Sequence, residues 1–173
     1  KVTGVQTCAL PISVLDWVLE GALSCPVAEV LVVWGGDERI LSHLPKDDRV
    51  RAVSSEAYIE GMGASLVQGI QALNAQCTGA FVFLGDMPRV PFGLAGSLIA
   101  AIGQGGLAAA PVHLGRRGHP VLISSPLFEQ LSKLTGDRGA SAILDQLGSK
   151  LVLIDAPDDG CLFDIDRPED LLV

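Results

Sequence analysis

The run Ala80-Phe81-Val82-Phe83-Leu84-Gly85-Asp86-Met87-Pro88 decides how this chain folds. Its apolar residues predict a buried strand over 80–84. One carboxylate, Asp86, follows the strand and comes just before a proline turn. In open α/β sheets, ligands bind in the crevice outside the carboxyl ends of the strands. We therefore expect a central strand that delivers Asp86 to a binding site, where the carboxylate either holds a metal ion or caps the turn.

Strands and helices are expected to alternate along the rest of the chain. Apolar runs predict further strands over 29–34, 49–54, 107–112, 119–123 and 150–154. Helical spacing and stop signals predict helices over 13–25, 37–44, 62–73, 92–102, 126–134, 139–147 and 168–172. This order predicts an α/β fold with a mostly parallel sheet covered on both faces, plus an antiparallel element around a turn at 115–118.

The composition fits one globular domain and argues against several classes of protein. The chain has 173 residues, of which 49% are hydrophobic and 18% charged, so it can bury one sizeable core. Its net charge of −8 argues against a nucleic-acid partner, which needs clustered Lys and Arg. No apolar run reaches the roughly 18 residues of a spanning helix, so no membrane association is expected. The four cysteines form no CxxC pair, which favours free thiols in a reducing cytoplasm over a zinc site.

Residues 1–12 differ from the rest of the chain. They show no helical or strand period, and residues 2–12 resemble the translation of a common sequencing adapter. We therefore expect 1–12 to be a non-native artefact and 13–173 to be the folded domain. An ordinary disordered tail is the alternative. In either case the native-like sequence begins with a helix for which Ser13 is a suitable N-cap.

Two further segments carry residues suited to nucleotide chemistry. The loop Gly61-Met62-Gly63-Ala64-Ser65 opens a helix, and glycines there let the backbone approach a ligand closely, although a tight turn would use them equally well. Asp164 and Asp166 lie in an extended stretch. We expect their side chains to point to opposite faces, so that at most one faces Asp86. Asp166 is also a candidate N-cap for the last helix.

Positive charge is concentrated in the turn Arg116-Arg117-Gly118-His119-Pro120. An arginine fork recognises phosphate or carboxylate, whereas a solvated turn with charged tips is the alternative. The segment Asp137-Arg138-Gly139-Ala140 opens another helix, where it is suited either to a ligand contact or to an N-cap with an ion pair.

Five segments, in this order, resemble the motifs of the MobA-like nucleotidyltransferases, and most closely those of the molybdenum cofactor cytidylyltransferases. The resemblance extends from Val14 to Val173. The segments are Gly61-Met62-Gly63-Ala64-Ser65-Leu66, Gly85-Asp86-Met87-Pro88, Arg117-Gly118-His119-Pro120-Val121, Gly136-Asp137-Arg138-Gly139-Ala140 and Asp164-Ile165-Asp166-Arg167-Pro168-Glu169-Asp170-Leu171. Each is short, but five of them in the same order are fairly specific.

The resemblance implies a Rossmann-like three-layer α/β/α sandwich of the nucleotide-diphospho-sugar transferase type. It also implies Mg²⁺-dependent transfer of CMP from CTP to molybdopterin cofactor, with release of pyrophosphate. Asp86 would be the catalytic carboxylate and main metal ligand, with Asp166 as the second ligand and Asp164 as the fallback. The nucleotide would contact Gly61, Met62, Gly63, Ala64, Ser65 and Gly85. The acceptor side would be lined by Arg117, Gly118, His119, Pro120 and Asp137.

The glycine-rich loop at the start of the family's fold has no counterpart before Val14. In the family this loop follows the first strand and brings backbone amides, an arginine and a lysine to the triphosphate. We therefore expect a sheet that lacks its first strand and a chain that is inactive as it stands. Alternatives are another NTP transfer, using GTP or a sugar phosphate, or a non-catalytic cofactor-binding chaperone. A molybdoenzyme or its maturation chaperone is the expected protein partner.

Overall fold

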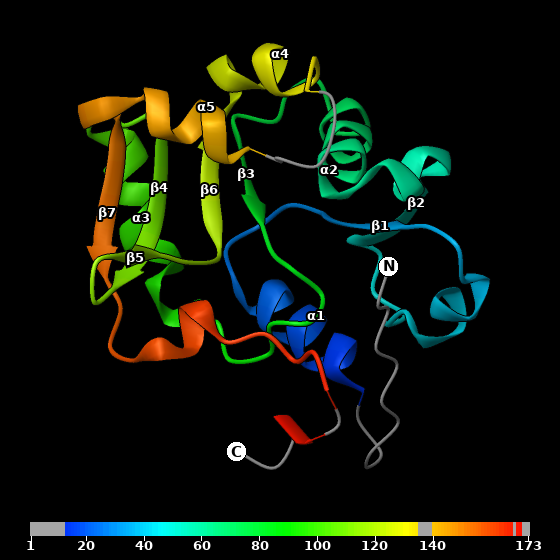
Figure 1. Ribbon diagram of the computed structural model, residues 1–173. Coiled ribbons are helices and arrows are strands. Elements are labelled where there is room, and N and C mark those ends of the chain that lie inside the picture. The colour runs from blue at the N-terminus through cyan, green and yellow to red at the C-terminus, as the bar shows by residue number, and fades with distance from the viewer. Residues whose placement is uncertain (1–12, 135–139, 168, 171–173) are drawn as a thin grey trace.

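The computed structural model describes residues 13–134, 140–167 and 169–170, and Figure 1 shows their arrangement. The first helix, α1 (Val14–Ser24), begins where the sequence predicts. The Ser13 hydroxyl accepts from the Asp16 amide, and the Asp16 carboxylate accepts from the Ser13 amide. These reciprocal bonds satisfy two amides that a helix start would otherwise leave free. The helix ends before Pro26, as its sequence also predicts.

Helices and strands alternate through the described residues. The other α-helices are α2 (Met62–Gln71), α3 (Ala95–Gly103), α4 (Phe128–Leu131) and α5 (Ser141–Gln146). The strands are β1 (Val30–Trp34), β2 (Val50–Ser54), β3 (Gly79–Val82), β4 (Ala108–His113), β5 (Arg116–Arg117), β6 (Val121–Ser124) and β7 (Leu151–Asp155). Short 3-10 helices are η1 (Glu38–His43), η2 (Glu56–Glu60), η3 (Phe92–Leu94), η4 (Ser125–Leu127), η5 (Gly148–Lys150) and η6 (Asp159–Leu162). Within the described part of the chain, no helix has the length and apolar character needed to cross a membrane.

Five strands form one mixed sheet. β4 pairs in parallel with β7, and it pairs antiparallel with β5 and β6. β6 in turn pairs antiparallel with β3. Strands β3, β4 and β7 therefore run in one direction, and β5 and β6 run in the other. The predicted α/β fold is confirmed, with β5 and β6 as its antiparallel element. The five-stranded sheet is mixed and not mostly parallel in its pairings, because β6 lies between β3 and β4 and runs antiparallel to both.

Helices cover both faces of this sheet because neighbouring residues of a strand point in opposite directions. Ala108 and Ile123 face a core that they form with α2, α4 and α5. Ala109 and Leu122, the next residue on β4 and the preceding one on β6, face a second core formed with α3. This alternation produces the three-layer sandwich that the resemblance implies (Figure 1).

β1 and β2 form a separate two-stranded parallel sheet beside β3 (Figure 1). Within the described residues β1 pairs with β2 alone and β3 with β6 alone, so each keeps one unpaired edge. Residues of both strands line a single cavity of about 1480 Å³, together with α1 and α2. Its walls are largely apolar and include Leu19, Val32 and Phe81. A cavity bounded by one unpaired edge of β1 and one of β3 agrees with the expectation of a sheet that lacks one strand.

Three local predictions need correction. Residues 38–43 form the 3-10 helix η1 instead of an α-helix, because the segment is short and Pro45 stops it before a full α-helical hydrogen-bond pattern develops. β3 lies at the edge of the five-stranded sheet and not at its centre. The turn expected at 115–118 lies at Leu114 and Gly115, because residues 116–117 pair with 112–113 as β5.

Candidate active site

Asp86 lies in the turn after β3 and carries one fully buried carboxylate oxygen. Its Oδ1 atom is inaccessible to solvent and has no hydrogen-bond partner among the described residues. Burial is the main cause that raises the pKa of Asp86, and the charges of Asp164 and Asp166 raise this pKa further. An ionised carboxylate buried without a partner is costly. Asp86 is therefore a position at which a bound cation would stabilise the protein.

The segment Asp164-Ile165-Asp166 is attached directly beside Asp86. The Ile165 amide donates to the Asp86 carbonyl oxygen at 2.9 Å, and the Ile165 side chain is buried. Asp164 and Asp166 are both exposed and line the same pocket. The expectation that they point to opposite faces is wrong, because residues two apart in an extended stretch share a face and the residue between them points the other way. Asp164 has the larger effect on Asp86, so it is at least as suitable a second ligand as Asp166.

These carboxylates fit a hard divalent ion of the Mg²⁺ type. Within the described residues, no group of three or more His, Cys, Asp or Glu side chains lies close enough to form an all-protein metal centre. Mg²⁺ does not need one, because it takes one or two carboxylates and completes its shell with water and substrate phosphates. Asp86 with Asp164 or Asp166 would supply that number of ligands. Asp86 Oδ1, which has no hydrogen-bond partner among the described residues, would gain one from a bound ion.

Gly118 holds the segment after β5 tightly against the chain that leads to Asp164. Its amide donates to the Pro111 carbonyl oxygen at 2.9 Å, and the next amide, that of His119, donates to the Cys161 carbonyl oxygen at 2.8 Å. A Cβ atom at Gly118 would lie 2.2 Å from the Cys161 oxygen. Only glycine allows this approach, so the predicted acceptor residue Gly118 has a structural role here.

His119 lies next to Asp86 as a neutral ring. Its Nδ1 atom lies 3.2 Å from the Val82 carbonyl oxygen. Because a carbonyl oxygen can only accept, Nδ1 carries the proton and Nε2 keeps its lone pair. Burial is the main cause that lowers the pKa of His119, although the nearby Asp86 opposes this. Pro120, which follows His119, is fully buried. Pro120 therefore packs inside the protein and is not exposed for contact with an acceptor.

The predicted nucleotide loop lies at the start of α2. Gly61 is the N-cap residue of this helix and has a φ of 113°, a conformation that favours glycine. Four of the predicted nucleotide residues line the cavity between β1 and β3, and Asp86 lines it with them: Gly61, Met62, Ser65 and Gly85. Gly63 and Ala64 do not contribute to this lining, and Gly63 is buried. The structure therefore brings part of the predicted loop and Asp86 to one cavity.

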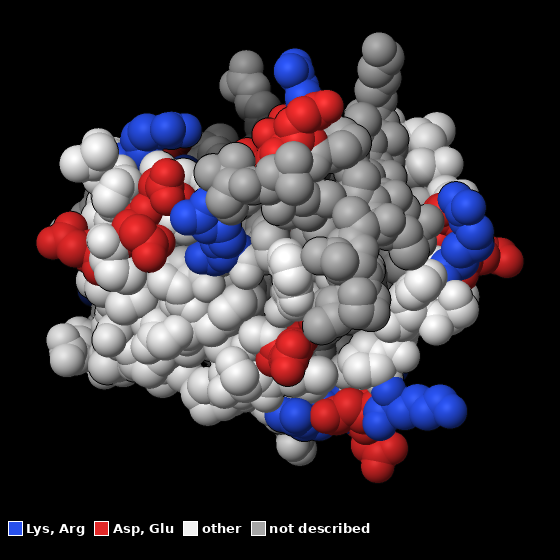
Figure 2. All heavy atoms as spheres, turned by 90° about the horizontal axis from the view of Figure 1, so that it is seen from below, with Lys and Arg blue, Asp and Glu red and all other residues white. Residues whose placement is uncertain are grey.

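The described residues that line this cavity include no positively charged side chain. Among the described residues that line it, the charged side chains are Glu29, Glu60 and Asp86, without any Lys or Arg. On the molecular face drawn in Figure 2, basic and acidic side chains alternate and form no continuous basic surface. A triphosphate carries several negative charges, so the described residues of the cavity do not neutralise it by themselves.

One of the predicted acceptor residues, Arg117, is not brought to the site. Arg117 points toward α5, where its Nη1 atom donates to Asp145 Oδ1 at 2.6 Å. Asp137 lies outside the described residues. The neighbouring residue Arg116 points the other way and lines the pocket that contains Asp164 and Asp166. Sequence analysis missed this difference, although the alternation of side chains along a strand separates Arg116 from Arg117.

A pocket of about 520 Å³ adjoins the two exposed carboxylates. Its opposite wall comes from the tip of the β4–β5 hairpin and from the segment after η6. The lining residues that sequence analysis did not single out are His113, Leu114, Asp159, Leu162 and Phe163. Their contribution depends on the tight β4–β5 hairpin, whose Leu-Gly turn lacks the usual sequence signal, and on the position of η6, which the local sequence does not reveal.

Comparisons with known proteins place this geometry among nucleotidyltransferases. Residues 11–151 match the family described as MobA-like NTP transferase domain. The homologue of Mycobacterium tuberculosis Rv0371c from Mycobacterium sp. strain JC1 is similar, with 25% identity, a TM-score of 0.79, and coverage of 94% of this chain and 81% of that chain. Rv0371c of Mycobacterium tuberculosis in complex with manganese is also similar. Its identity to this chain is 23% and its TM-score is 0.72, and the match covers 94% of this chain and 88% of that chain. Molybdopterin-guanine dinucleotide biosynthesis protein A of Archaeoglobus fulgidus has 19% identity and a TM-score of 0.65. That match covers 92% of this chain and 82% of that chain. None of the curated proteins compared with this chain matches it.

Proposed function

This chain belongs to the MobA-like NTP transferase family, and on that premise we propose that it transfers CMP from CTP to molybdopterin cofactor and releases pyrophosphate. The family indicates nucleotidyl transfer as the type of reaction. The choice of CTP and of molybdopterin rests on the resemblance of the five sequence segments to the cytidylyl branch. The manganese bound to the similar mycobacterial protein is consistent with a divalent metal at this site.

The observation that carries the proposal is the buried, partnerless Oδ1 atom of Asp86. It lies at the start of the crevice beyond the sheet, beside Asp164 and Asp166. An aspartate that merely caps a turn would use its oxygens on backbone amides, whereas this oxygen has no such partner among the described residues. Asp86 is thus better suited to hold an ion than to stabilise its own turn.

In the proposed reaction, an oxygen of the acceptor phosphate attacks the α-phosphorus of CTP. The bond from that phosphorus to the β-phosphate breaks, and pyrophosphate leaves with the bonding electrons. Bound Mg²⁺ would neutralise phosphate charge and orient the reacting groups. Asp86 and either Asp164 or Asp166 would hold it, while the loop from Gly61 to Ser65 and Gly85 would contact the nucleotide. His119, with its ring neutral, adds no positive charge that would compete for Asp86.

The described residues supply the metal side of this reaction but not the triphosphate side. Because no Lys or Arg of the described residues lines the cavity between β1 and β3, little stabilises the charge that develops on pyrophosphate. We therefore expect turnover of CTP by the chain to be very slow. Metal binding at Asp86 does not depend on that missing charge and remains measurable.

The first experiment measures Mn²⁺ binding by electron paramagnetic resonance. We expect Asp86→Asn to weaken Mn²⁺ binding roughly tenfold or more, since it removes the charge of the main ligand. Asp155→Asn, at the exposed end of β7, is the matched control and should bind Mn²⁺ as the unmodified protein does. Equal Mn²⁺ affinity for all three proteins would reject the assignment of Asp86.

The second experiment measures pyrophosphate release in the presence of Mg²⁺, molybdopterin and either CTP or GTP. We expect release with CTP to exceed release with GTP, and Asp86→Asn to abolish both. A preference for GTP would move the chain to the guanylyl branch. Tight binding of molybdopterin without any release, unaffected by Asp86→Asn, would instead support a cofactor-binding chaperone.

A further inference from the structure

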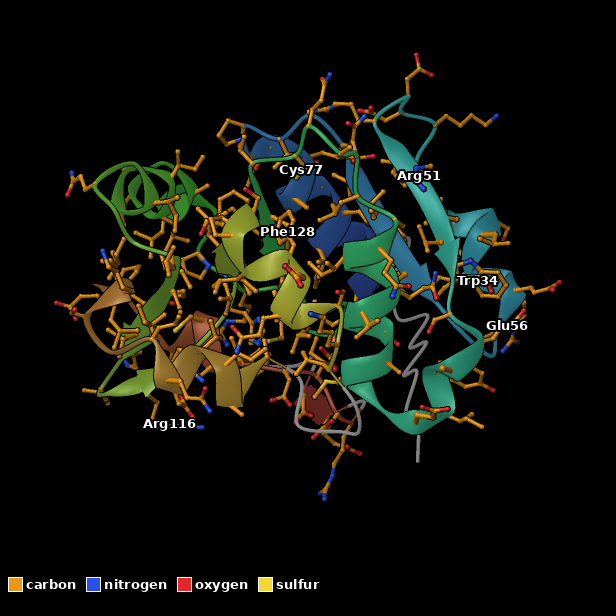
Figure 3. The ribbon with its side chains drawn as sticks, turned by 90° about the horizontal axis from the view of Figure 1, so that it is seen from above. Trp34, Arg51, Glu56, Cys77, Arg116 and Phe128 are labelled. Carbon is orange, nitrogen blue, oxygen red and sulfur yellow. The ribbon has the colours of Figure 1, made fainter. Side chains whose placement is uncertain are left out.

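Strand β7 (Leu151–Asp155) forms the edge of the five-stranded sheet opposite β3. Within the described residues it pairs with β4 alone, in one regular register of five positions. Figure 1 shows β7 as the outermost strand on that side, and no residue of β7 lines the cavity between β1 and β3 or the pocket beside Asp164. In Figure 3, Arg116 of β5, which also pairs with β4, lies across the molecule from Arg51 of β2. The β7 edge is thus separate from the candidate active site.

Three residues of β7 turn their backbone groups away from the sheet. The Lys150 carbonyl and the Ala156 amide flank the strand, and both form hydrogen bonds of 2.8 Å toward β4. Successive residues of a strand turn their backbone groups to alternate sides. The residues that face the open side are therefore Leu151, Leu153 and Asp155. Among the described residues, none forms a backbone hydrogen bond with them on that side.

β7 also lacks the features that keep an exposed sheet edge from pairing. Such edges usually carry a lysine, a proline or a bulge, and the five residues of β7 include none of these. Val152 and Ile154 pack on the core formed with α3, and Leu151 packs on the opposite core. Leu153 lies on the same face as Leu151 but is 49% exposed. An apolar side chain therefore lies uncovered at the middle of this edge.

We propose that the β7 edge binds a second copy of this chain through antiparallel pairing of β7 with β7, which joins two five-stranded sheets into one. A twofold axis perpendicular to the sheet relates the copies, so the same edge serves both. This axis keeps each face of the sheet on its own side, and residues that pair must therefore lie on the same face. Leu153 pairs with Leu153 of the second copy, and Leu151 pairs with Asp155. All three outward residues then form hydrogen-bonded pairs, with about six backbone hydrogen bonds in total.

The charges at the two ends of β7 favour this arrangement. Lys150 precedes the strand and Asp155 ends it. Antiparallel pairing brings the Lys150 end of one copy to the Asp155 end of the other, whereas parallel pairing would bring like charges together. The proposed register keeps the two Asp155 carboxylates at opposite ends of the strand pair. It also covers both Leu153 side chains, each by the other.

The first test measures the mass of the protein by sedimentation equilibrium at concentrations from about 1 to 500 µM. We expect the mean mass to rise from that of one chain toward that of two. Leu153→Lys places two like charges directly opposite each other and should raise the dissociation constant of the dimer at least about tenfold. Leu41→Lys, at a leucine of η1 that is 40% exposed, is the matched control and should leave this constant unchanged. Circular dichroism of both variants checks that they fold.

Two further measurements test the register and do not depend on the folding of Leu153→Lys. In the presence of oxidised glutathione, Leu153→Cys should form a disulfide between copies, because the Cα atoms of a hydrogen-bonded pair lie about 5.5 Å apart. Asp155→Cys should not, since the two positions 155 lie about 13 Å apart along the strands. Hydrogen exchange of the Leu151, Leu153 and Asp155 amides should become slower at high protein concentration, whereas exchange of the Val152 and Ile154 amides should not change.

A mass of one chain at every concentration would overturn the inference. A dimer whose dissociation constant is unaffected by Leu153→Lys would overturn it as well, and so would disulfide formation by Asp155→Cys as complete as that by Leu153→Cys. Protection that appears with concentration at Val152 and Ile154 but not at Leu153 would also reject the pairing of β7 with β7.

Discussion

Replacing Gly118 by alanine tests whether the close contact between β5 and η6 supports the candidate site. The new Cβ atom would lie 2.2 Å from the Cys161 carbonyl oxygen and 2.7 Å from its carbon. Both are backbone atoms, so one of the two segments must move. Forcing a group into such a packed place costs about 1–3 kcal/mol, and loss of the bond from the His119 amide to Cys161 adds about 1 kcal/mol. We therefore expect Gly118→Ala to lower the free energy of unfolding by roughly 2–4 kcal/mol in total.

The assay is urea unfolding followed by circular dichroism, with Mn²⁺ binding measured on the same samples. Gly96→Ala is the matched control, because a Cβ at Gly96 in α3 meets nothing within 4 Å. That variant should be more stable by about 0.5–1 kcal/mol, since alanine favours a helix over glycine. If Gly118→Ala unfolds at the same urea concentration as the unmodified protein, the close contact does not hold the two segments together and the reasoning fails.

Three further predictions concern other parts of the chain. Burial raises the pKa of the Cys25 and Cys161 thiols. Iodoacetamide at pH 8 should therefore modify the partly exposed Cys77 at least about tenfold faster than Cys25 or Cys161, as measured by peptide mass spectrometry. Faster modification of Cys161 than of Cys77 would contradict the described packing. The hydrogen bonds from Arg39 hold the pKa of Asp37 at about 2. Any stability from this pair is therefore complete above the ordinary carboxylate pKa and is lost as the pH falls through about 2. A carboxyl NMR titration should give that midpoint, and Arg39→Gln should return it toward the ordinary value of about 3.9. Replacing residues 1–12 by an apolar strand-forming segment should fill the cavity between β1 and β3 and raise Tm by roughly 5 °C or more. Deleting residues 1–12 should change Tm little. A large decrease in Tm on deletion would show that these residues belong to the fold.

The sequence predicts those features that depend on local chemistry. Ser13 and Asp16 fix the start of α1, and the valine-rich run before Gly35 gives β1. The order of short motifs leads to the correct family. It also singles out Asp86, whose Oδ1 atom is buried without a hydrogen-bond partner among the described residues. These features depend on capping, period and motif order, all of which can be seen within a few residues.

The remaining features have several causes, of which pairing between distant residues is one. β3 lies at a sheet edge because β6 covers only one of its sides, and the sequence of β3 does not show this. The turn at Leu114 was missed because leucine and glycine do not form the usual Asn-Gly signal of a tight hairpin. Arg117 was placed at the acceptor side because a two-residue strand is too short to reveal its alternation. The error over Asp164 and Asp166 had a different origin, since their spacing alone puts them on one face.

The cavity between β1 and β3 also affects how the molecule opens. No ladder of backbone hydrogen bonds crosses from the β1–β2 sheet to the five-stranded sheet within the described residues. The two sheets are joined by side-chain packing of α1 and α2, which is more easily disrupted than continuous strand pairing. Amide hydrogens of β1 and β2 should therefore exchange with solvent through a smaller opening event than those of β4 and β6. We therefore expect the described residues to behave as two cooperative units, so that the unit formed by β1 and β2 can open while the unit that contains β4 and β6 stays folded.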